Sequence, residues 1–152
     1  MPSAFASLAR EGHAPSGDLV LLLVADEEVG GLGVHEGYGL RWLVQHQKEN
    51  GDQRHDEHGN AGMYTHGQAT IVLCEAFAMT GDEELRIPAQ KAVDFVLKAQ
   101  FTDGGWRYTP APRTQKGDTS VVGWQLMALQ SARSANLTVP DEAWGMADLY
   151  MD

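Results

Sequence analysis

The chain has 152 residues, of which 43% are hydrophobic and 21% are charged, and its formal net charge is -10 at pH 7. A chain of this length can form one domain and bury roughly 70% of the surface that its unfolded form exposes. The acidic balance repels phosphate backbones, and the sequence has no Lys/Arg cluster to overcome it, so nucleic acid is not expected as a partner.

The apolar run from Leu19 to Ala25 is the candidate for a membrane segment near the start of the chain. Its seven residues are too few to span a bilayer, and the acids "DEE" behind it do not look like a cleavage site for a secretory signal. Cys74 lies inside the apolar run "ATIVLCEAFAM" and is expected to be a small buried hydrophobe rather than a reactive thiol. We therefore expect a cytoplasmic chain without a membrane span or a cofactor.

The first 36 residues differ in pattern from the rest of the chain. Phe5, Leu8 and Ala9 predict a short helix, the β-prone run "DLVLLLVA" predicts a strand, and the glycines of "GGLGVHEGYG" predict a turn or linker. After this point the apolar residues recur at helical spacing. The sequence thus predicts a helix-strand segment at 1–36 and an α/α repeat region at 37–152.

Five helices are expected in the repeat region. Gly81 marks the end of the second helix, and the third begins with acids and restarts at Pro88. Asp118 and Ser120 are candidates to cap the fourth helix. The expected ranges are 38–47, 63–81, 82–100 and 118–133, with a last helix from Pro140 onward.

A short turn occurs twice, 53 residues apart, in "GLRWLVQHQKENGDQ" and "AVDFVLKAQFTDGGW". A Gln at a helix C-terminus can donate to carbonyl groups that lack partners, Gly allows a positive φ, and Trp covers the turn with an apolar plate. We expect this corner to close each of two stacked helical hairpins. Its residues are Gln47 and Gly51 in the first copy and Gln100, Gly104, Gly105 and Trp106 in the second.

The second corner, from Gln100 to Trp106, resembles the QW motif of the terpenoid cyclase and protein prenyltransferase repeat family. The resemblance covers residues 39 to about 140, although Gln53 stands in the first copy where the family has Trp. It implies a mainly α fold, namely a partial α/α toroid of about two helical-hairpin repeats. It also implies that a concave face binds a ligand, for which the candidate residues are Tyr64, His66, Trp106, Tyr108, Asp118 and Trp124.

The catalytic devices of that family are incomplete in this sequence. The Asp-x-Asp-Asp acid of squalene-hopene cyclases is absent. Asp118 stands where the zinc-binding Asp of prenyltransferases would be, but Ser120 replaces the expected Cys and no His follows. The resemblance therefore implies an incomplete or non-catalytic squalene-cyclase-like module that binds an apolar small molecule or a protein partner. Exposed apolar helix faces would also allow self-association.

Residues 4–31 resemble a different family, the acetylornithine deacetylase and succinyl-diaminopimelate desuccinylase metallohydrolases. That resemblance would make Glu27 the general base and Glu28 a metal ligand. The remaining ligands of a two-zinc site cannot be identified, so no metal site is predicted. An enzyme, either a terpenoid cyclase using Asp118 or a zinc metallohydrolase using Glu27 and Glu28, stays open as the alternative function.

Overall fold

A computed structural model describes residues 38–54 and 62–152 of the chain. The regular elements in these ranges are all helices, which confirms the predicted mainly α class. The predicted segment at 1–36, with Glu27 and Glu28, lies outside the described residues. The helices are α3 (Tyr38–His46), α4 (Gly62–Thr80), α5 (Glu83–Ala99), α6 (Thr119–Ser134) and α7 (Asp141–Met151).

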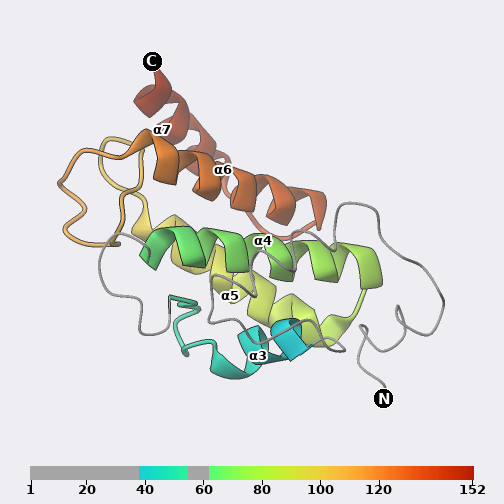
Figure 1. Cartoon of the computed structure of the whole chain (residues 1–152). Helices are drawn as coiled ribbons and strands as arrows, with labels where there is room; N and C mark the ends of the chain where they lie inside the picture. Colours follow the sequence, from blue (N-terminus) through green and yellow to red (C-terminus); the bar gives the residue numbers. More distant parts are fainter. Residues whose placement is uncertain (1–37, 55–61) are drawn as a thin grey trace.

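Helix α4 lies at the centre of this arrangement and packs against α3, α5 and α6 (Figure 1). Helices α4 and α6 begin at the same end of the molecule, and α5 runs in the opposite direction between them along the chain (Figure 1). Small or apolar residues occupy most of α4. Because few of its positions favour contact with water, the helix is buried on nearly every side. Cys74 is fully buried there, as predicted, and burial raises the pKa of its thiol to about 12.

None of the helices in the described ranges is long and apolar enough to cross a membrane. The cytoplasmic location and the protein partner stay predictions.

The helix ends follow the sequence signals at two places and depart from them at a third. Gly81 follows α4 with φ +63°, and Asp118 is the N-cap of α6, both as expected. The predicted restart at Pro88 is wrong, because α5 begins at Glu83 and continues through the proline. The side chain of Asp82 caps the helix start, and Leu85 and Ala89 are buried on either side of Pro88, so packing holds the turn that the proline weakens.

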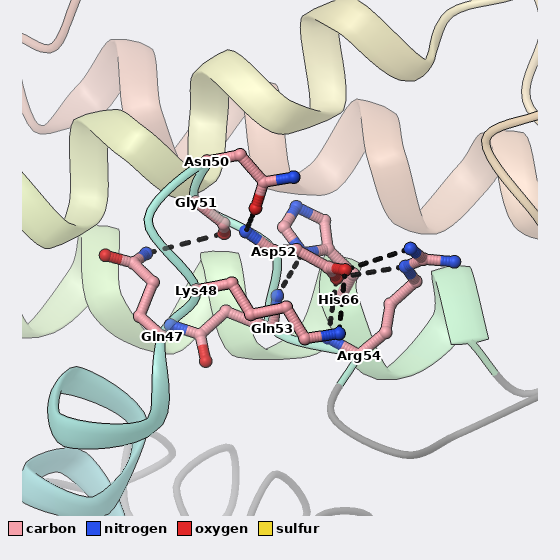
Figure 2. Close-up of polar contacts among 8 residues, drawn as sticks. All are labelled: Gln47, Lys48, Asn50, Gly51, Asp52, Gln53, Arg54 and His66. Atoms are coloured by element: carbon pink, nitrogen blue, oxygen red, sulfur yellow. Dashed lines mark hydrogen bonds and ion pairs between the residues drawn. The ribbon is translucent and has the colours of Figure 1, made fainter.

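The first corner connects α3 to the rest of the molecule. Gln47 Nε2 donates to the carbonyl oxygen of Gly51 at 3.5 Å and to that of Pro88 in α5 at 2.9 Å. The side chain of Gln53 is buried and donates from Nε2 to the carbonyl oxygen of Leu43 at 3.1 Å. Figure 2 shows how Gln47 closes the turn over Gly51. The corner thus connects α3, through Leu43, to α5, through Pro88.

The second corner has the same bonds in the same order. Gln100 Nε2 donates to the carbonyl oxygens of Gly104 at 2.8 Å and of Ala143 in α7 at 3.0 Å. Trp106 is fully buried and donates from Nε1 to the carbonyl oxygen of Val96 at 2.8 Å. The two corners therefore share one hydrogen-bond pattern, and they attach α5 and α7, respectively.

Candidate functional site

Two of the predicted ligand-lining residues lie in the core. His66 on α4 has no exposed surface, and its Nδ1 accepts from the backbone N–H of Gln53 at 3.1 Å. Its Nε2 lies 3.1 Å from the carbonyl oxygen of Ala92, which fits a neutral ring with the proton on Nε2. Burial lowers the pKa of His66 to about 4, so the ring stays neutral. His66 and the equally buried Trp106 cannot contact a ligand in this conformation.

Three other predicted residues come together at the end of the molecule where α4 and α6 begin. The hydroxyl of Tyr108 donates to Asp118 Oδ2 at 2.9 Å, and the rings of Tyr64 and Tyr108 have centroids 6.2 Å apart. Ser120 joins them, because its hydroxyl donates to Asp118 Oδ1 and lies 2.5 Å from the hydroxyl of Tyr64. We call Tyr64, Tyr108, Asp118 and Ser120 the Tyr–Asp cluster.

Backbone bonds hold the cluster in place. The N–H of Met63, at the start of α4, donates to the carbonyl oxygen of Tyr108 at 3.1 Å. The N–H of Asp118 donates to the carbonyl oxygen of Trp106 at 2.8 Å, so the second corner fixes the start of α6. Asp118 also caps α6 through the N–H groups of Ser120 and Val121. The cluster therefore stands on two helix N-termini and one corner, where the helix dipoles favour negative charge.

The hydrogen bonds in the cluster shift two pKa values in opposite directions. The bond to Asp118, followed by the charge of that carboxylate, raises the pKa of Tyr108, so the phenol keeps its proton at neutral pH. The hydrogen bonds from Ser120 and then from Tyr108 lower the pKa of Asp118, so the carboxylate is ionised. The cluster therefore offers a proton acceptor and a proton donor 2.9 Å apart.

Arg107 adds a positive charge beside the cluster. Its guanidinium carbon lies 5.3 Å from the centre of the Tyr108 ring, and its Nη1 donates to the carbonyl oxygen of Lys116 at 3.2 Å. Sequence reasoning missed Arg107, although it directly precedes Tyr108 in the chain. Trp124, which was predicted, is half-buried one turn beyond Ser120 on the same side of α6. The group therefore brings one cation, one carboxylate and aromatic rings close together.

The first corner carries a second group of charges, shown in Figure 2. Asp52 is 2% exposed and forms ion pairs with Arg54 at 2.9 Å and with Lys48 at 3.3 Å. Burial alone would raise the pKa of Asp52, but the hydrogen bonds and charge of Arg54 hold it below its ordinary value. Because its partners satisfy the carboxylate, this group fixes the turn. Across residues 38–54 and 62–152, no group of three His, Cys, Asp or Glu side chains could hold a metal ion.

Comparison with known proteins gives one family. The family model described as pectic acid lyase matches residues 28–121, which is more than half of the chain. No curated protein and no solved structure matches significantly.

This match overturns the function expected from the sequence. The assignment of residues 39–140 to the terpenoid cyclase family, and that of residues 4–31 to the metallohydrolases, are both wrong. The predicted function as a squalene-cyclase-like module is therefore wrong, and so are its two alternatives, a terpenoid cyclase and a zinc metallohydrolase. The physical reason is that the Gln corner is a device for closing a helical hairpin and carries no information about the reaction. The chain belongs to the pectic acid lyase family.

Proposed function

We propose that the chain binds pectic acid and cleaves it by β-elimination at the Tyr–Asp cluster. The observation that carries this proposal is the family match, whose range of 28–121 includes every residue of the cluster as well as Arg107. Pectic acid is a polymer of galacturonic acid, so each sugar presents a carboxylate at C5 and an apolar ring face. The two tyrosine rings of the cluster and the neighbouring guanidinium of Arg107 complement these features.

Elimination requires three things from a protein. A base must remove the proton from C5, and a cation must stabilise the charge that develops on the C5 carboxylate. A donor must protonate O4 of the bond that breaks. The electrons of the C5–H bond form the C4=C5 double bond, and those of the C4–O4 bond leave with the oxygen.

The residues of the cluster and the neighbouring Arg107 can fill these roles. Asp118 is ionised and accepts the C5 proton, while Arg107 pairs with the uronate carboxylate. Tyr108 keeps its phenolic proton and donates it to O4. The proton on Asp118 then returns to the Tyr108 phenolate through the 2.9 Å hydrogen bond between them, which restores both groups. Tyr64 and Trp124 offer apolar faces to the sugar rings.

The experiment measures the ultraviolet absorbance of the unsaturated product when the full chain is mixed with polygalacturonate. The wild-type chain should generate the C4=C5 bond, and Tyr108→Phe should lower kcat by about a hundredfold or more, because the proton donor is removed. Tyr150→Phe is the matched control, since the Tyr150 hydroxyl lies near α6, 3.3 Å from Thr119 Oγ1, but outside the cluster. It should leave kcat unchanged.

A second variant separates catalysis from folding. Asp118→Asn keeps a side chain that caps α6 well but removes the charge of the base. We expect the thermal midpoint to stay close to that of the wild type while elimination is lost. An absence of unsaturated product from the wild type, or equal kcat values for Tyr108→Phe and Tyr150→Phe, would contradict the proposal.

A further inference from the structure

The loop between α5 and α6 concentrates positive charge in an acidic chain. Arg107, Arg113 and Lys116 lie within ten residues, and no acid occurs between Gly104 and Gly117, whereas the chain as a whole carries a net charge of -10. Residues 111–116 are all exposed. We call residues 107–116 the cationic loop.

The cations of this loop are not neutralised by neighbouring acids. In the part of the chain that the structure describes, none of the three forms an ion pair with a carboxylate. Asp103, just before the loop, accepts from the N–H groups of Gly105 at 2.9 Å and of Gly117 at 2.7 Å. Its carboxylate is therefore committed to the backbone of the corner, and the charges of the loop remain available to a ligand.

The loop is also fixed in shape before any ligand binds. Arg113 Nε donates to the carbonyl oxygen of Gln100 at 2.7 Å, and the N–H of Thr102 donates to the carbonyl oxygen of Arg113 at 3.2 Å. Arg107 bonds the carbonyl oxygen of Lys116 across the loop. A loop that is already ordered loses little conformational entropy when it binds.

The cationic loop and the Tyr–Asp cluster form one continuous stretch of the molecule. Tyr108 follows Arg107 inside the loop, and Asp118 comes two residues after Lys116. Figure 1 shows the loop beyond the N-terminal ends of α4 and α6. Tyr64 and Ser120 of the cluster lie in the first turns of these two helices. A polymer held at the cluster would thus continue along the loop.

We propose that the cationic loop is a binding surface for a polyuronate chain, in which Arg113 and Lys116 contact the carboxylates of sugars beyond the one held at the cluster. This inference rests on the proposed function, because it places the reacting sugar at the Tyr–Asp cluster. Each uronate sugar carries one negative charge, and the charges recur at a regular spacing along the polymer. Such a ligand suits the separated cations of the loop.

The test is affinity electrophoresis of the full chain in gels that contain polygalacturonate, compared with gels without polymer. Lys116→Glu should weaken retardation by about fivefold or more, because it reverses one charge of the loop. Lys91→Glu changes the net charge by the same amount at an exposed position in the middle of α5, and it should change retardation by less than about twofold. Fully methyl-esterified pectin has the same backbone without the charges and should not retard the wild type.

The outcomes distinguish this inference from the proposed elimination. Equal effects of Lys116→Glu and Lys91→Glu, or equal retardation by esterified pectin, would overturn the loop as a carboxylate-binding surface. If retardation depends on Lys116 while no unsaturated product forms, the loop is supported and the elimination fails. If product forms and Lys116→Glu leaves KM unchanged, the elimination is supported and the loop is overturned.

Discussion

Gln53 and Trp106 hold the same position in the two corners although their chemistry differs. Each side chain is fully buried and donates one N–H to the carbonyl oxygen of the residue ten positions earlier. What the position requires is therefore a buried N–H donor, which an amide and an indole both supply. The backbone N–H of Gln53 also donates to Nδ1 of His66 at 3.1 Å. The first corner therefore also holds the ring of the buried His66 through a backbone hydrogen bond.

His66 makes folding stability depend on pH. Its pKa is lowered to about 4 in the folded chain, so the unfolded chain binds a proton first as the pH falls below 6.5. The stabilisation is complete above that pH and is lost as the pH falls toward 4. Between pH 7 and about pH 4.5 the wild type should lose about 2 kcal/mol more unfolding free energy than His66→Gln, measured by urea denaturation.

Asp52 and Arg54, whose charges act on His66, are present in both proteins, so the difference between the proteins isolates the imidazole. Parallel losses in the wild type and His66→Gln would show that His66 is not buried in a neutral form.

At the scale of elements, the sequence predicted what depends on local chemistry. The two corners, the Asp118 cap and the end of α4 at Gly81 follow from side chains and backbone conformations within a few residues. The passage of α5 through Pro88 could not be predicted in this way, because it depends on the burial of Leu85 and on other contacts outside the local sequence.

The corner glycines are expected to be the positions least tolerant of a side chain. Gly104 has φ +88°, and a Cβ there would lie 1.8 Å from the carbonyl oxygen of Met146 in α7. Gly51 has φ +91°, and a Cβ there would lie 2.0 Å from the carbonyl oxygen of Lys91 in α5. Gly104→Ala should therefore cost about 3 kcal/mol or more, since the backbone of the corner and α7 must separate.

Gly81→Ala is the matched control, because Gly81 also has a positive φ, +63°, but a Cβ there meets nothing within 4 Å. It should cost only about 1 kcal/mol, the intrinsic penalty of the left-handed conformation. The measurement is the unfolding free energy in urea. A Gly104→Ala cost no larger than that of Gly81→Ala would mean that α7 does not pack against the corner.

At the scale of the whole molecule, sequence reasoning identified part of the candidate site and misjudged its chemistry. Tyr64, Tyr108 and Asp118 were predicted to line a ligand site and do lie together, whereas His66 and Trp106 are buried. Helical spacing could not separate these two groups, since it does not say which neighbours cover each side of a helix. The family was misjudged because the most distinctive motif, the Gln corner, determines architecture alone.

The arrangement also predicts an order of local stability. Helix α4 is enclosed by three helices, whereas α7 has only Ala143 and Ala147 buried and is held by the second corner. Backbone amides of α4 should therefore exchange with deuterated solvent at least about tenfold more slowly than those of α7. Mass spectrometry of peptic fragments measures both.

Variants of the two corner glutamines test the cause of this difference. Gln100→Ala removes the bond to Ala143 and should speed exchange in α7 while leaving α3 unchanged. Gln47→Ala removes the equivalent bond to Pro88 and should leave α7 unchanged. If α7 were as protected as α4, or if Gln100→Ala accelerated every helix equally, the second corner would not be the separate attachment of α7. The described helices would then unfold as a single cooperative unit.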